Sequence, residues 1–133
     1  MSLFDFFSSN EKRQKLCHIK NLVLLAMADA KTEESELALI SAICCREGIT
    51  ENDLQKVIDN PESVKFIPPT DNATRIIYIK DMVLLMMSDG NIHENEMIIC
   101  KKFAKALGYK PEVIDAMIGN IIAEFKAKMQ KQY

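Results

Sequence analysis

Two short acidic strings contain the residues of this chain that are best suited to chemistry. Each string has an Asp followed seven residues later by a Glu: Asp29 with Glu36, and Asp89 with Glu96. Carboxylate oxygens are the ligands that hard cations such as calcium and magnesium prefer in proteins. The two pairs therefore predict acidic sites for a divalent cation, with calcium or magnesium favoured over zinc, or for a charged partner.

A local structural role for the same carboxylates is the alternative. An Asp at the end of a helix faces the negative end of the helix dipole, which is unfavourable. Because an Asp occurs at this position in both strings, a compensating role is expected. Capping is one such cause, because the Asp can accept hydrogen bonds from the next helix's first amides and the Glu can complete a capping box. Glu94 and Glu96 lie about 200° apart round a helix and cannot easily face one ion together. Spacing alone leaves open which of them joins Asp89.

Residues that could support catalysis do not form a recognisable set. His18 lies at the start of an apolar segment, and His93 lies at the second acidic string, where it can cap a helix or serve as a spare ligand. Neither histidine has zinc-ligand spacing, and no glycine motif for phosphate binding is present. The four cysteines include no Cys-x-x-Cys pair, so we expect reduced thiols that are mostly buried. We therefore expect a protein that is not an enzyme.

An internal repeat organises the elements that position the acids. Residues 19–58 align with residues 79–118 at a constant offset of 60, without a gap. Eleven aligned positions are identical, and both members of each acidic pair are among them. Two copies are too few for a solenoid, so we expect one helical bundle with approximate two-fold symmetry.

Each copy of the repeat predicts three helices. Apolar residues recur at helical spacing over residues 19–27 and again over 79–87, and both segments are apolar almost all round. We expect these two helices to be central and to pack against each other. The second helices are expected over residues 33–47 and 94–107, and each is followed or ended by a glycine.

The third helices and the connection between the copies are expected from turn and capping residues. The first of these helices should begin at Thr50, and the second at Pro111. The second should continue toward Met129, with Gly119-Asn120 as its weakest point. Residues 60–70 contain three prolines and are expected to form a linker.

Composition agrees with an all-α fold class. The chain has 133 residues, 48% hydrophobic and 27% charged, with only 4 Gly and 4 Pro, which favours helices in a single domain. We expect one bundle of six to seven helices over residues 1–133, with repeat one at about 11–59 and repeat two at about 71–130. A formal net charge of −2 argues against a nucleic-acid partner. No secretion signal or membrane span is recognised, so we expect a cytoplasmic location.

The two ends of the chain differ in character. Phe4, Phe6 and Phe7 are expected to dock onto the core as part of a short helix. Residues 29–62 carry a net charge of −6, whereas residues 101–133 carry +4. Such charges usually lie on solvated helix faces, although the acidic side can attract cations or a basic partner.

The acidic strings and the repeat together resemble a known family. An apolar helix that ends in Asp-Gly, with a Glu seven places after the Asp, occurs twice in TerB-like domains of tellurite-resistance and stress-response systems. A related domain begins some membrane-anchored DnaJ-like co-chaperones. The resemblance covers residues 16–125. The second string fits the motif with Asp89-Gly90 and Glu96, whereas the first has Ala30 in place of the glycine.

This resemblance implies an all-helical fold of two similar halves, an acidic surface that binds metal cations, and a place in multi-protein stress complexes near the membrane. The acidic positions of the family fall on Asp29, Glu36, Asp89 and Glu96, which prefers Glu96 over Glu94. The expected partners are proteins, including membrane-associated stress-response proteins, and a homodimer is an open alternative. The competing function is a metal-free helical adaptor, similar to a co-chaperone interaction domain, whose acids only cap helices.

Overall fold

The computed structural model describes residues 9–28 and 33–131, which form six α-helices and no strand. In chain order the elements are α2 (Asn10–Ala26), α3 (Glu34–Glu47), α4 (Glu51–Asp59), the 3₁₀ helix η1 (Pro61–Ser63), α5 (Asn72–Met86), α6 (Glu94–Ala106) and α7 (Glu112–Lys131). The prediction of an all-α bundle of six to seven helices is confirmed. Within this part of the chain, no helix has the length and apolarity needed to cross a bilayer. The expected docking of Phe4, Phe6 and Phe7 lies outside the described residues.

The helix boundaries recur at the offset found in the sequence. α2 and α5 end sixty residues apart, and α3 and α6 begin sixty residues apart. Gly48 and Gly108, which follow α3 and α6, have φ angles of 72° and 90°. Glycine adopts this left-handed conformation without the steric cost that a Cβ atom imposes, which suits it to ending a helix. The two copies therefore share these helix boundaries and the same left-handed glycine after their second helices.

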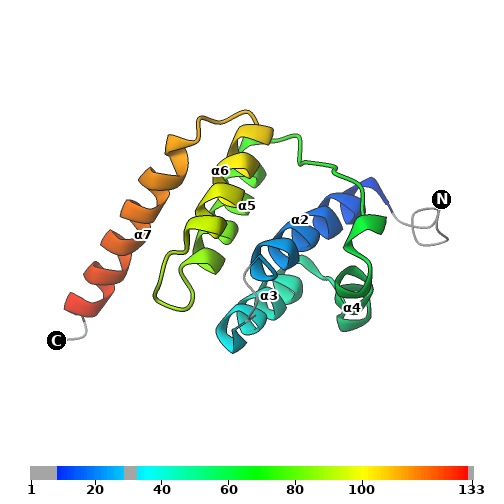
Figure 1. The fold of residues 1–133 in the computed structure, drawn as a ribbon, viewed down its shortest axis with the longest axis horizontal. Coiled ribbons are helices and arrows are strands. Elements are labelled where there is room, and N and C mark those ends of the chain that lie inside the picture. The colour runs from blue at the N-terminus through cyan, green and yellow to red at the C-terminus, as the bar shows by residue number, and fades with distance from the viewer. Residues whose placement is uncertain (1–8, 29–32, 132–133) are drawn as a thin grey trace.

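The two central helices are α2 and α5, which pack against each other (Figure 1). α3 and α4 pack on α2, while α6 and α7 pack on α5, so α4 and α7 form the two flanks of the molecule. Most of the largest fully buried side chains come from the central pair: Leu16, Ile19, Leu22, Leu25, Ile79, Met82, Leu85 and Met86. The predicted central pair is confirmed, although Leu24 on α2 is 41% exposed and α2 is not covered all round.

The linker between the copies is held against α2. The Nζ atom of Lys20 donates a hydrogen bond to the carbonyl oxygen of Val64 at 2.6 Å. The backbone amide of Ile67 donates to Sγ of Cys17 at 3.3 Å. These contacts fix the path by which the chain crosses from α4 to α5.

The third helices of the two copies differ in length. α4 ends at Asp59, whereas α7 continues without a break through Gly119, the equivalent position, to Lys131. The predicted weak point at Gly119-Asn120 is therefore not a break in the helix. Consequently, the second half of α7 has no counterpart in the first copy.

Candidate functional site

The second acidic corner is the turn between α5 and α6. Gly90 has a φ angle of 84°, a left-handed conformation that allows the chain to turn tightly after α5. The backbone amide of Asn91 donates a hydrogen bond to Oδ1 of Asp89 at 2.9 Å. His93 occupies the N-cap position of α6. Asp89 thus stabilises its own turn before the chain enters α6.

Asp89, His93 and Glu96 meet at this corner. Nε2 of His93 lies 3.0 Å from Oδ2 of Asp89 and 3.9 Å from Oε1 of Glu96. Glu96 is 3% exposed, whereas Glu94 is exposed on the surface of α6. Hydrogen bonds from His93 and from the Asn91 amide hold the pKa of Asp89 below its usual value. The structure therefore brings the predicted pair Asp89 and Glu96 near the same ring nitrogen of His93.

At the first acidic corner, the structure describes one member of the predicted pair. Asp29 lies outside the described residues, so its pairing with Glu36 stays a prediction. Glu36 is 7% exposed, and its Oε1 accepts a hydrogen bond from the backbone amide of Glu33 at 3.2 Å. The side chain of Glu33 in turn accepts a hydrogen bond from the backbone amide of Glu36, which completes a capping box at the start of α3. Glu36 thus has the capping role that the metal-free alternative predicts.

Metal ligation by the predicted residues stays a prediction. Within residues 9–28 and 33–131, no group of three or more His, Cys, Asp or Glu side chains could hold a metal ion as placed. At the second corner, an ion bound by both carboxylates would compete with Nε2 of His93, which lies 3.0 Å from Asp89 and 3.9 Å from Glu96. Binding of a cation there would therefore require the His93 ring, whose side chain is 43% exposed, to turn toward the ion or away from it.

The cysteine thiols are not poised for chemistry. All four cysteines are unpaired, and only Cys45 is exposed. Burial raises the pKa of Cys44 to about 11, and burial together with the charge of Glu96 raises the pKa of Cys100 to about 12. Because the thiolate is the reactive and metal-binding form, these two thiols are poor nucleophiles and poor ligands at neutral pH.

A second polar cluster, which the sequence analysis did not single out, lies between α2, α3 and α5. Nε2 of His18 lies 2.7 Å from Oδ2 of Asp81. Arg46 of α3 donates to both carboxylate oxygens of Asp81, at 3.0 Å and 2.6 Å. The His18 ring also stacks on Tyr78, with ring centroids 3.7 Å apart and planes 3° from parallel. His18 and Asp81 are 1% and 4% exposed, so this network is part of the core.

Two signals in the sequence could have revealed this network. His18 and Tyr78 are equivalent positions of the repeat, so their stacking joins the same point on the two central helices. Asp81 is a charged residue within a largely apolar helical segment, and a charge on a buried helix face needs a partner. Its partner Arg46, however, comes from a different helix and has no local signal.

Burial and hydrogen bonding set the charge states in this network. Burial lowers the pKa of His18 below its ordinary value and outweighs the attraction of Asp81. Burial alone would raise the pKa of Asp81, but the hydrogen bonds from His18 and Arg46 together hold it below its usual value. At neutral pH the network therefore combines a neutral imidazole with a carboxylate and a guanidinium.

Acidification should destabilise the fold through His18. Below the ordinary histidine pKa of about 6.5, the unfolded chain takes up a proton that the folded chain still excludes, so the free energy of unfolding falls as pH falls. Urea denaturation at about pH 7.5 and about pH 5.5 would measure this loss. We expect wild type to lose more stability than His18→Gln. Equal losses in wild type and His18→Gln would contradict the assignment.

A cavity of about 670 Å³ adjoins the network at the surface. It is lined by Arg46, Glu47 and Tyr78, together with Lys15 and Asp71 from neighbouring elements. Its walls carry charges of both signs, and Arg46 is already engaged by Asp81. The cavity therefore does not favour a ligand of one charge.

No family model, no curated protein and no solved structure matches this chain. The resemblance of residues 16–125 to TerB-like domains therefore stays a prediction that rests on the acidic strings and the repeat.

Proposed function

We propose that this chain is a non-enzymatic, TerB-like binding module of a cytoplasmic stress-response system that engages protein partners through apolar surface grooves. The observation that carries this proposal is a pair of such grooves. One, of about 260 Å³, lies among α2, α3 and α4 and includes Met27 and Leu37. The other, of about 540 Å³, lies among α3, α5 and α7 and includes Ile122 and Phe125.

The side chains at these grooves are unusually open to solvent. Met27 is 53% exposed and Phe125 is 63% exposed, although both are large and apolar. Isolated apolar residues on a surface need no explanation, but contiguous ones commonly mark a site of association. The acids support this function without a metal. Glu36 and Asp89 each accept a hydrogen bond from a nearby backbone amide, which stabilises the start of α3 and the turn after α5.

A divalent cation at the second corner is the alternative function. The observation that favours it is the approach of Asp89 and Glu96 to a common point beside His93. Calcium or magnesium would use the carboxylates alone, whereas zinc would also use the imidazole. In either case the ion would link the turn after α5 to the first turn of α6.

Thermal melts with calcium, magnesium, zinc or EDTA distinguish the two candidates. A ligand that binds only the folded state raises the midpoint of unfolding. If the chain binds partners through its grooves without a metal, we expect no shift in the midpoint of unfolding at millimolar metal. We then also expect only a small loss of stability in Glu96→Gln. A metal-induced rise that disappears in the double variant Asp89→Asn, Glu96→Gln would instead establish the cation site.

Affinity capture from cells that produce the protein tests the interaction itself. We expect wild type to retain partners in EDTA, and the double variant Met27→Glu, Phe125→Glu to lose them. Ile98→Glu is the matched control, because Ile98 is 46% exposed on α6 and lines neither groove. Capture that chelation abolishes, and that the double variant leaves intact, would overturn the proposal.

A further inference from the structure

The first half of the molecule leaves open an apolar surface that the second half covers. Leu24, Met27 and Leu37 are 41%, 53% and 48% exposed, whereas the residues sixty positions later are all partly buried. In the second half, Leu84 and Met87 face the second half of α7 across a groove. The first half has no such segment, because α4 ends at Asp59. Among the helices that the structure describes, none covers the equivalent surface of the first copy.

The open surface continues into a groove, which we call the first-half groove. It is lined mainly by Val23, Met27, Leu37, Ile40, Leu54 and Ile58. α2 has Ala26 at the position where α5 has Met86, whose side chain is 1% exposed. The larger side chain occupies in the second half a volume that the first half leaves empty.

The second half of α7 carries a matching apolar stripe. Ile122, Phe125 and Met129, which we call the α7 stripe, are 41%, 63% and 46% exposed. Their spacing of i, i+3 and i+7 places them within about 60° of one another round the helix. This is the pattern by which an amphipathic helix fills an apolar groove. Lys126 and Lys128 lie on either side of the stripe.

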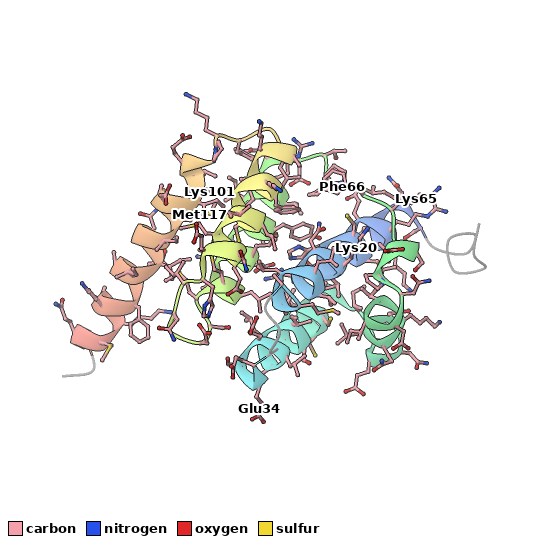
Figure 2. The ribbon with its side chains drawn as sticks, in the orientation of Figure 1. Lys20, Glu34, Lys65, Phe66, Lys101 and Met117 are labelled. Atoms are coloured by element: carbon pink, nitrogen blue, oxygen red, sulfur yellow. The ribbon has the colours of Figure 1, made fainter. Side chains whose placement is uncertain are left out.

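The charges beside the groove and beside the stripe are opposite. On α3, the exposed Glu34 precedes Leu37 by three residues, and on α4 the exposed Glu51 precedes Leu54 by three residues. Residues at this spacing share a helix face, so both acids lie at the rim of the first-half groove. Figure 2 shows Glu34 at the outer end of α3, pointing away from the other helices. The two acids can thus meet the lysines that flank the α7 stripe.

The α7 stripe cannot reach the first-half groove of its own chain. Ser35 and Leu39 of α3 face the second half of α7. Leu37 lies about 200° round α3 from Ser35, and so on another side of that helix. Figure 1 also shows α4 and α7 on opposite flanks of the molecule. None of the helices within residues 9–28 and 33–131 fills the groove, which leaves it open to a helix of a second molecule.

We propose that the α7 stripe of one copy docks into the first-half groove of a second copy. This inference rests on the proposed function and names one partner, another copy of this chain. Each copy offers one groove and one stripe, so the contact joins two different surfaces rather than the same surface twice. The apolar contact supplies the attraction, and the flanking charges orient the helix in the groove.

Complementation between two variants of the full chain tests this contact. Leu37→Lys places a charge in the groove, and Phe125→Glu places one in the stripe. Sedimentation velocity should show that wild type associates as its concentration rises, and that each variant alone dissociates at least tenfold more readily. A mixture of the two variants should form a one-to-one complex, because one intact groove and one intact stripe remain. Ile98→Lys should associate like wild type.

Several outcomes would overturn the inference. One is a wild type that remains monomeric at the highest attainable concentration. Another is a loss of association in Ile98→Lys equal to that in the groove and stripe variants. A third is a mixture of the two variants that forms no complex. Circular dichroism checks that the variants fold, and Lys126→Glu with Lys128→Glu gives an independent test of the stripe. If wild type captures other proteins but stays monomeric when pure, only the self-association fails. If neither occurs, the proposed function fails as well.

Discussion

Replacing Asp81 with Ala should lower the free energy of unfolding by about 1–3 kcal/mol. Asp81 is the common acceptor for His18 and for both guanidinium nitrogens of Arg46 that face it. Its removal leaves the fully buried Nε2 of His18 without its hydrogen-bond partner, whereas Arg46, whose side chain is 45% exposed, keeps water and Glu47 as partners. Urea denaturation at neutral pH would measure the loss, which is a large part of the total stability of a domain this size.

Two variants serve as controls for this prediction. Asp81→Asn keeps the shape of the side chain and an acceptor oxygen, so it should cost less than Asp81→Ala. Asn21 is the equivalent position in the first copy, where it makes only a long contact of 3.8 Å to Sγ of Cys17. Asn21→Ala should therefore cost less than about 1 kcal/mol. A loss of similar size for Asp81→Ala would show that the network contributes little to stability.

Helix positions could be predicted from the sequence because the interactions that set them are local. The apolar spacing of residues 19–27 and 79–87 identified the central pair, and the offset of 60 related the helices of the two copies. The helix start at Thr50 was predicted for the same reason, and Thr50 accepts a hydrogen bond from the backbone amide of Asp53.

The arrangement of the polar and exposed residues could not be predicted to the same extent. Arg46 and Asp81 are 35 residues apart and meet only because α3 packs beside α5. Leu24 and Leu37 have the spacing of buried residues, but both are exposed, and no helix in the part of the chain that the structure describes covers them. At the second corner, spacing alone left open whether Glu94 or Glu96 joins Asp89, and the approach of Asp89 and Glu96 to one nitrogen of His93 depends on the turn geometry.

Replacing Leu25 with Ala should lower the free energy of unfolding by about 2–5 kcal/mol. Leu25 is 0% exposed at the contact between the central helices, so its truncation leaves a cavity as well as losing buried apolar surface. Its neighbour Leu24 provides a matched control on the same helix, because 41% of it is exposed. Leu24→Ala should cost less than about 1 kcal/mol.

The repeat extends this prediction to a second position. Leu85 is the equivalent of Leu25 and is also 0% exposed, so Leu85→Ala should cost a similar amount. Urea denaturation of the three variants would compare these losses directly. If Leu24→Ala proved as costly as Leu25→Ala, Leu24 would have to be covered in solution. Such a result at high protein concentration, but not at low concentration, would indicate that a second molecule covers it.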